Sequence, residues 1–239
     1  KPHSDCNIKV RLIDHYRPHI HPKRVQGTFT GQHDITHDIR EFRFTLDEPV
    51  MFLPGQYALL HVPGIQGGRA YSMSNVTSDG KEWHFQIRRV PNGQCTTALF
   101  DHLKVGEKIG LDGPYGMAYL REDAERDILC LGGGSGLAPV VSIARGWARS
   151  DRLKGRKLHF IYGGRTPADI CGEDMLKELR GYGVDLHYYP VVSMPEADKA
   201  GAWKGLTGFV HDVAAQTFGD GLKDMEIYFA GPPMMAEAV

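Results

Sequence analysis

A run of glycines between two apolar segments is the clearest sign of chemistry in this sequence. Residues 132–136 read Gly-Gly-Gly-Ser-Gly, after the apolar run 128–131 and before a helical pattern. Glycines let a backbone approach a pyrophosphate, and a helix start offers it unpaired amides and a positive dipole end. The run departs from G-x-G-x-x-G because Pro139 stands at the last position, and a glycine turn without a ligand is the alternative. The sequence therefore predicts a dinucleotide site here.

A second segment carries an arginine, an aromatic ring and hydroxyls, in the order Arg69-Ala70-Tyr71-Ser72-Met73-Ser74-Asn75. In a strand, Arg69, Tyr71 and Met73 would share one face, with Ser72 on the other face or at a kink. A guanidinium suits a phosphate, and an aromatic plane suits a flat heterocycle. This pattern favours a ligand-binding strand, although the spacing also fits an ordinary half-buried strand with a solvated arginine.

A glycine turn before a short helix is a further candidate for a phosphate. The run Gly93-Gln94-Cys95-Thr96 leads into an apolar helical pattern. Thr96 would be either a cap or a hydroxyl in the first turn, close to amides that suit an anion. A helix cap without a ligand is the alternative.

The first half of the chain must hold these last two segments in strands. Short alternating or β-branched segments between turn residues predict strands at 8–12, 25–30, 39–46, 57–62, 69–74, 83–90 and 108–111. There is only one short helical segment, residues 96–103. This half is therefore predicted to be an antiparallel barrel or sandwich.

The second half alternates strands with helices. Strand patterns cover residues 128–131, 157–162, 184–192 and 226–230, and helical patterns cover 137–148, 169–179 and 209–218. Such alternation implies right-handed crossovers and a parallel sheet. The change falls in the charged stretch 121–126, so we expect two domains, residues 1–123 and 124–239.

The charge balance excludes two classes of partner. With 28 basic and 29 acidic residues the net charge is −1, so we expect neither nucleic acid nor a membrane as a partner. No apolar run approaches the about 20 residues that cross a bilayer, and no signal-peptide pattern opens the chain. These observations predict a cytoplasmic protein.

No metal site is predicted. The spacing that holds zinc or an iron–sulfur cluster is missing among the four cysteines, Cys6, Cys95, Cys130 and Cys171. A clear third ligand is also missing for the histidines, which we expect to be solvated or core residues: His15, His19, His21, His33 and His37.

In order and spacing, these motifs resemble the ferredoxin–NADP reductase superfamily. They are most similar to the reductase components of bacterial multicomponent aromatic or alkene monooxygenases of the toluene and phenol type. The resemblance covers nearly the whole chain through further matches at Pro54-Gly55-Gln56-Tyr57, Tyr162-Gly163-Gly164-Arg165 and Ala230-Gly231-Pro232-Pro233-Met234. Members often have a cysteine where Ala230 stands, so no thiol is available at that position to place a nicotinamide.

The resemblance implies an antiparallel β-barrel that binds FAD, followed by an α/β domain with a parallel sheet that binds a nicotinamide nucleotide. It implies that Arg69 binds a flavin phosphate, that Tyr71 packs on the isoalloxazine and that Ser72 hydrogen-bonds near N5. Tyr71 and Ser72 are thus the catalytic candidates. The other FAD-binding candidates are Gln86, Ile87, Arg88, Gly93, Gln94, Cys95 and Thr96. Those for the dinucleotide are Gly133, Gly134, Ser135, Gly136, Pro139, Arg165, Gly231 and Pro232.

The expected enzyme is an NADH-dependent reductase that takes hydride onto FAD and passes single electrons to an iron–sulfur centre. That centre would feed a multicomponent hydrocarbon oxygenase or its ferredoxin. A reductase of another branch, serving a haem or cytochrome, is one alternative. A regulatory module that holds FAD without turnover is the other, because fold alone does not prove activity.

Two further expectations concern the cofactors. The chain's cysteines cannot hold a [2Fe–2S] cluster, so we expect it outside this chain, with residues 1–6 as the tail of its domain or a linker and the C-terminus cut at Val239. A free-standing reductase is the alternative. FAD is expected over FMN because Arg69 and the Gly93 turn are two separate phosphate-suited places, as a pyrophosphate needs.

NADH is expected over NADPH. A 2′-phosphate calls for clustered basic residues after the second and third strands of the nucleotide domain, where Arg165 stands alone. NADP-using relatives place an arginine directly after the serine that corresponds to Ser193, and here Met194 follows. Glu196 and Asp198 would repel the phosphate, although Lys199 and Lys204 lie near enough to weaken that repulsion.

Overall fold

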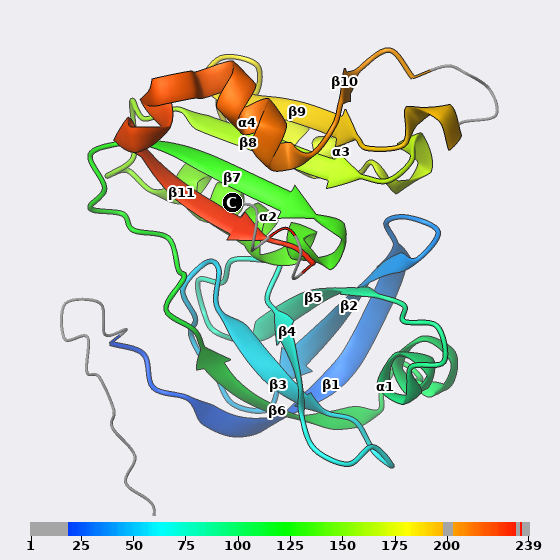
Figure 1. Cartoon of the computed structure of the whole chain (residues 1–239). Coiled ribbons are helices and arrows are strands. Elements are labelled where there is room, and N and C mark those ends of the chain that lie inside the picture. Colours follow the sequence, from blue (N-terminus) through cyan, green and yellow to red (C-terminus); the bar gives the residue numbers. More distant parts are fainter. Residues whose placement is uncertain (1–18, 198–202, 233–234, 236–239) are drawn as a thin grey trace, which may run out of the picture.

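The computed structural model describes residues 19–197, 203–232 and 235, which form two domains, one above the other in Figure 1. Residues 116–126 connect the last strand of the first domain to the first strand of the second. Several sequence-based expectations lie outside the described residues: the tail 1–6, the strand 8–12, His15, Asp198, Lys199, Pro233 and Met234.

The first domain is an antiparallel sheet that curls into a near-barrel, as predicted. Its strands lie in the order β4-β3-β6-β1-β2-β5. Their bounds are β1 Lys23–Asp34, β2 Ile39–Leu46, β3 Tyr57–His61, β4 Arg69–Ser72, β5 Glu82–Arg88 and β6 Lys108–Tyr115. A bridge between Met73 and Phe85 brings the two ends of this order together. Between β5 and β6, the helix α1 Gln94–Thr97 continues as a π-helical turn, Ala98–His102.

Alternation along β5 gives this strand two different faces. The side chains of Trp83, Phe85 and Ile87 are fully buried in the barrel core. Successive side chains of a strand point to opposite faces. The intervening residues, among them Gln86 and Arg88, therefore face out of the barrel and are available to the second domain.

The second domain is a parallel sheet with helices on both faces, again as predicted. The strand order is β10-β9-β8-β7-β11. Bounds are β7 Asp127–Gly133, β8 Leu158–Gly164, β9 Leu186–Val192, β10 Leu206–Thr207 and β11 Met225–Ala230. Helices α2 Leu137–Arg149 and α3 Glu173–Lys177 share one apolar cluster with the sheet, and α4 Val210–Phe218 shares another on the opposite face (Figure 1). Short 3-10 turns occupy 134–136, 167–169, 195–197 and 219–224.

The structure of the second domain differs from the sequence-based expectations in one helix and one short strand. The predicted helix 169–179 is reduced to α3, because Gly172 has a left-handed φ of +93° that a helix cannot contain. The two-residue strand β10 was not predicted, since so short a strand has no periodicity of its own.

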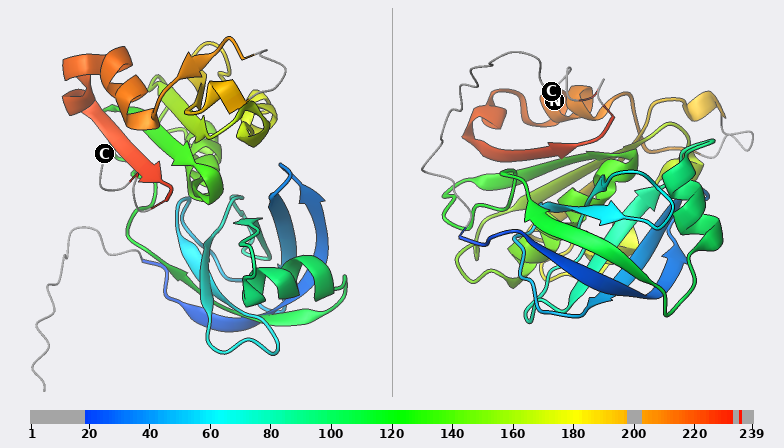
Figure 2. Two further views of the ribbon diagram at one scale, coloured as in Figure 1. Left: turned by 45° about the vertical axis from the view of Figure 1, so that its right-hand side comes forward. Right: turned by 90° about the horizontal axis from the view of Figure 1, so that it is seen from below.

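Helix α2 joins the two domains. A Cβ at Gly146 would lie 2.6 Å from Cγ of Pro54, so the helix packs against the barrel where it has no side chain. Gly55 makes a similar close approach, because its Cβ would lie 2.5 Å from the Ala118 carbonyl oxygen and 3.2 Å from the Ile143 side chain. Figure 2 shows the two domains from two further directions. Among the described residues, no helix is long and apolar enough to cross a membrane.

Candidate functional site

A pocket of about 420 Å³ lies between the two domains. The barrel contributes Asp38, Ile39 and Arg88. The second domain contributes the glycines at the ends of β7 and β8, together with Ser193 and residues 208–211. In the strand order, β8 lies next to β7 on one side and β11 lies next to β7 on the other side, so the direction of the chain connections reverses at β7. In parallel α/β sheets, ligands bind at the carboxyl ends of the strands at such a reversal. The pocket therefore has both the size and the place of a ligand site.

The predicted glycine loop forms one side of this pocket. Gly134 has φ +55°, and a Cβ at Gly136 would lie 1.9 Å from the Ala230 carbonyl oxygen, so both positions need glycine. The Tyr162 hydroxyl donates a hydrogen bond to the Gly134 carbonyl at 3.0 Å and fixes the loop. Ser135 is exposed at the tip, and Pro139 lies in the first turn of α2, where no backbone partner is lost. The loop thus presents bare backbone at a helix start.

Aromatic rings that the sequence analysis did not single out form another side. Phe209 is 60% exposed, and its ring stacks on that of His211 with centroids 5.7 Å apart. Both rings line the pocket, together with Ser193 and Arg165. In the sequence, Phe209 was only the first residue of a predicted helix. The one signal available in the sequence was a large aromatic residue directly after Gly208.

Arg88 belongs to β5 of the barrel, and its side chain lines the pocket between the domains. Its Nε donates to an Asp38 carboxylate oxygen at 2.6 Å. A Cβ on Gly134 would lie 3.1 Å from Nη1 of Arg88, so this guanidinium of the first domain reaches the glycine loop of the second.

The side chains of the two residues before Arg88, which belong to the same predicted set, do not line the pocket. Ile87 is fully buried in the barrel core. The buried Gln86 amide donates to Glu41 at 3.2 Å and to the Met175 sulfur at 3.4 Å. The side-chain oxygen Oε1 of Gln86 is buried and has no hydrogen-bond partner among the described residues, so this atom and the two backbones remain available to a cofactor.

The candidate flavin strand β4 lies beside α1. Arg69 is exposed, and its guanidinium donates to the carbonyls of Gln66 and Gly68 at 3.2 and 3.3 Å. No carboxylate of the described residues pairs with it. The half-buried Tyr71 donates to the Cys95 sulfur at 3.7 Å, and burial, then Cys95, raise the pKa of this tyrosine. Tyr71 of β4 and Cys95 of α1, 24 residues apart in sequence, are thus brought together, with Arg69 two residues before Tyr71 on the same strand.

Thr96 has the second of its two predicted roles. Its buried hydroxyl lies in the first turn, accepts from the Val90 amide at 3.2 Å and donates to the Gly93 carbonyl at 3.1 Å. A Cβ on Gly93 would lie 2.7 Å from that hydroxyl oxygen. The side chain therefore fixes the turn, and the backbone amides of Gln94, Cys95 and Thr96 are what the turn offers to an anion.

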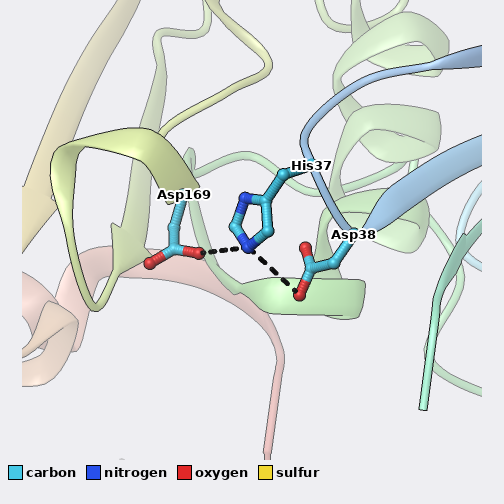
Figure 3. Close-up of side chains that lie close together, drawn as sticks. All are labelled: His37, Asp38 and Asp169. Carbon is cyan, nitrogen blue, oxygen red and sulfur yellow. Dashed lines mark ion pairs between the residues drawn. The ribbon is translucent and has the colours of Figure 1, made fainter. Parts of the chain in front are cut away.

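His37 meets two carboxylates, one from each domain, at the edge of the pocket (Figure 3). Its Nε2 lies 3.8 Å from Asp38 and 3.9 Å from Asp169. Asp38 also pairs with Arg88, and Asp169 accepts from the Thr166 amide at 2.8 Å. The sequence analysis considered His37 but could not predict this cluster, because its third member, Asp169, lies more than a hundred residues away. Both carboxylates have protein partners, so we assign no metal here.

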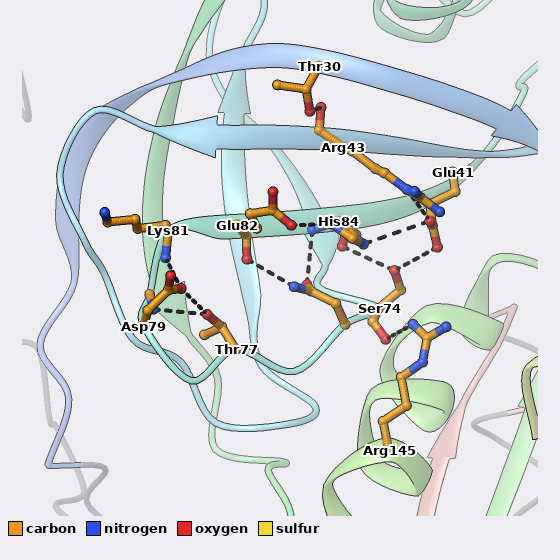
Figure 4. A network of polar contacts seen from close by, with 12 residues as sticks. Thr30, Glu41, Arg43, Ser74, Thr77, Asp79, Lys81, Glu82, His84 and Arg145 are labelled. Carbon is orange, nitrogen blue, oxygen red and sulfur yellow. Dashed lines mark hydrogen bonds and ion pairs between the residues drawn. The ribbon is translucent and has the colours of Figure 1, made fainter. Parts of the chain in front are cut away.

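A buried carboxylate organises the outward face of the barrel beside this pocket (Figure 4). Glu41 is only 2% exposed and accepts from Arg43 at 2.9 Å, Gln86 at 3.2 Å and the Ser74 hydroxyl at 3.4 Å. Burial raises the pKa of Glu41. The hydrogen bonds from Gln86 and Arg43, with the nearby His84, lower that pKa more, so the net shift is downward.

Comparison with known proteins gives two family matches, one for each domain. A family described as an oxidoreductase FAD-binding domain matches residues 26–119. One described as an oxidoreductase NAD-binding domain matches residues 130–239.

Individual relatives cover most of the chain. The ferredoxin–NAD(P)+ reductase CarAd of Metapseudomonas resinovorans is 36% identical over 238 residues, which are 98% of this chain and 69% of that protein. The phenol 2-monooxygenase reductase component DmpP of Pseudomonas sp. strain CF600 is 32% identical over 89% of this chain and 59% of its own length. The solved ferredoxin reductase in carbazole 1,9a-dioxygenase superposes with a TM-score of 0.85 at 33% identity, covering 96% of this chain and 67% of that one.

The lowered pKa of Glu41 predicts acid-sensitive stability. Replacing Glu41→Gln keeps the shape but removes the charge, and we expect the free energy of unfolding at pH 7 to fall by about 1–3 kcal/mol. Because the folded pKa lies below the unfolded one, this contribution is complete above the unfolded pKa and is lost as the pH falls through the folded pKa. Urea unfolding of both proteins from pH 7 to pH 3.5 measures the difference.

Glu48→Gln is the matched control, because Glu48 is an exposed acid of the same domain. Its unfolding free energy should stay within about 0.5 kcal/mol of the wild type. A Glu41 difference that did not shrink toward pH 3.5 would contradict the assignment.

Proposed function

The chain belongs to the ferredoxin–NADP reductase superfamily as an NAD(P)H-dependent FAD reductase, and we propose that its electrons come from NADH. They pass singly to an iron–sulfur centre that serves a multicomponent hydrocarbon oxygenase or its ferredoxin. One observation carries the proposal. In the pocket between the domains, Arg88 of the barrel lies beside Gly134 of the glycine loop, so ligands of the two domains would meet there.

The barrel residues fit FAD. The exposed Arg69 guanidinium is available to a phosphate, and the Gly93 turn offers first-turn amides to a second phosphate. The half-buried Tyr71, held by Cys95, offers a ring beside them, and Ser72 follows it on the same strand. When bound, FAD accepts a hydride from reduced nicotinamide and gives up its electrons one at a time.

The second domain fits the nicotinamide dinucleotide. Gly133, Gly134 and Gly136 leave backbone for the pyrophosphate at the start of α2, with Ser135 at the tip and Pro139 in the first turn. A Cβ on Gly133 would lie 3.8 Å from Pro232, which places residues 231–232 directly over the loop. The remaining task of the chain is to align the two ligands and exclude water.

The iron–sulfur centre is assigned to a part of the protein outside this chain. Cys95, Cys130 and Cys171 are separate free thiols, and burial raises the pKa of Cys130 and Cys171. The chain spans about two thirds of the length of the ferredoxin–NAD(P)+ reductase it matches. A fused cluster would receive electrons at high effective concentration.

Cofactor content is the first test. The purified chain should be yellow, release FAD and not FMN on extraction, and lose its visible flavin band on anaerobic addition of NADH. Arg69→Ala should retain FAD at least about 10-fold more weakly, because a charge-assisted contact to phosphate is lost. The exposed Arg152→Ala is the control and should bind FAD like the wild type. A flavin that NADH does not bleach would indicate the non-catalytic module instead.

Nucleotide preference is the second test. The kcat/KM for NADH should exceed that for NADPH by about 10-fold or more. Arg165 is the one basic residue in the segment 165–169 that follows β8, and the exposed acid Glu196 stands three residues after Ser193 in the sequence. Met194→Arg should narrow the ratio by adding a cation after the serine. Comparable kcat/KM values in the wild type would contradict the preference.

The electron acceptor is the third test. With NADH, this chain should reduce ferricyanide rapidly and a purified phenol-type oxygenase component slowly. Fusion of a plant-type [2Fe–2S] domain before residue 19 should raise the second rate by about 10²-fold through effective concentration. Equal rates with and without the fused domain would overturn this part of the proposal. Faster reduction of a cytochrome than of the oxygenase would favour the haem-serving branch.

A further inference from the structure

Helix α2 contacts the barrel through two hydrogen bonds to consecutive backbone carbonyls. The Ser142 hydroxyl donates to the Asn75 carbonyl at 2.8 Å, and Arg145 Nη1 donates to the Ser74 carbonyl at 2.8 Å. The two donors are three residues apart, so they lie on one face of the helix. Figure 4 shows Arg145 reaching from α2 to the end of the Ser74 segment.

The accepting carbonyls come directly after the candidate flavin strand. β4 ends at Ser72, so the carbonyls of Ser74 and Asn75 lie beyond its regular ladder, and α2 supplies their donors. The Ser74 amide is held by the His84 carbonyl at 2.8 Å, and the Asn75 side chain by the Glu82 carbonyl at 2.9 Å. The segment is thus fixed to β5 on the barrel side.

The donors belong to the helix that starts at the glycine loop. Ser142 is five residues after Leu137, about 8 Å along the helix axis. The path from the loop to the candidate flavin strand therefore runs through half of one helix, two hydrogen bonds and two residues. A shift of α2 would move one ligand site relative to the other.

The position of Arg145 is energetically unfavourable for a charged side chain, because it is partly removed from water. Arg145 is half-buried, and burial lowers the pKa of its guanidinium, although the carboxylates of Glu41 and Glu178 offset part of that effect. The nearby Arg149 on the same helix is exposed. Burying a charge to bind a single carbonyl contributes little stability, so its benefit must come from geometry.

We propose that Ser142 and Arg145 are positioning residues that set the approach of the nicotinamide to the flavin by fixing α2 to residues 74–75. This inference rests on the proposed function. Reacting atoms must approach to about 3–3.5 Å, and a displacement of about 1 Å can cost 10²-fold in rate. Neither side chain lines the pocket that contains the glycine loop, and Arg145 borders a separate cavity with Glu41 and Asn75. Both therefore act on the pocket through the helix and the strand.

The test separates rate from binding in the FAD-loaded protein. Ser142→Ala and Arg145→Gln are compared with the wild type by anaerobic stopped-flow reduction over a range of NADH concentrations. The limiting rate of flavin reduction should fall by about 3-fold and 10-fold respectively. The NADH concentration at half-saturation and the FAD content should change by less than about 2-fold. Arg145→Lys should recover part of the rate, because an ammonium can also donate to the Ser74 carbonyl.

The controls remove the same chemical groups from exposed positions. Ser78→Ala and Arg149→Gln should keep the wild-type limiting rate. Limiting rates within 2-fold of the wild type in both Ser142→Ala and Arg145→Gln would overturn the proposal. So would FAD loss with an unchanged rate per bound flavin. If Arg145→Gln does not fold, the limiting rate of Ser142→Ala alone tests the proposal. That variant loses only one hydroxyl group, so we expect it to fold.

A readout without nucleotide distinguishes this proposal from the proposed function. If NADH does not reduce the wild type, the function fails. The contact is then judged by amide hydrogen exchange at residues 73–76 and 137–145. Faster amide exchange in both segments of Ser142→Ala than in the wild type supports the contact between α2 and residues 74–75. Exchange equal to that of the wild type refutes its positioning role.

Discussion

The close packing of one helix against the barrel determines where everything else in this molecule lies. At Gly146 a helix and a barrel loop approach each other so closely that a methyl group would collide with Pro54. The same helix begins at the glycine loop, which is itself pressed onto the end of β11 at Gly136. Interiors packed to this density transmit displacement rather than absorb it. The two domains therefore behave as one frame around their shared pocket.

Features that depend on local backbone chemistry were predictable from sequence. The glycine loop and the Gly93 turn need conformations or clearances that few residues allow, and strand periodicity placed Arg69 and Tyr71 on one face. Both domain types followed from the change of rhythm near residue 121, and the structure has an antiparallel near-barrel followed by a parallel sheet. For the loop, the turn and the strand the relevant information lies within about ten residues, and for the domain types it lies in patterns repeated along each half of the chain.

Features that depend on the meeting of the domains were not predictable in this way. Gln86 and Arg88 share the outward face of β5. The Gln86 amide donates to Glu41 and Met175, whereas Arg88 lines the pocket. Periodicity says which side of a strand a residue faces, but not what covers that side. The same limit applies to Phe209. Its exposed ring lines the same pocket as Arg88 and the glycine loop, which come from distant parts of the chain.

The composition of the pocket's sides has an evolutionary consequence. The surface that we propose for the pyrophosphate is backbone at Gly133 and Gly134. Gly163 and Gly164 add further backbone to the lining, and a Cβ at Gly163 would lie 2.6 Å from Val210. The rest of the lining is made of side chains, including Phe209, His211 and Ser193, whose amide donates to the Gly164 carbonyl at 3.0 Å. Mutational drift on the side-chain surface can alter which nucleotide is preferred while the anchoring surface stays constant. Divergence among such enzymes should therefore accumulate on one surface of a single cavity.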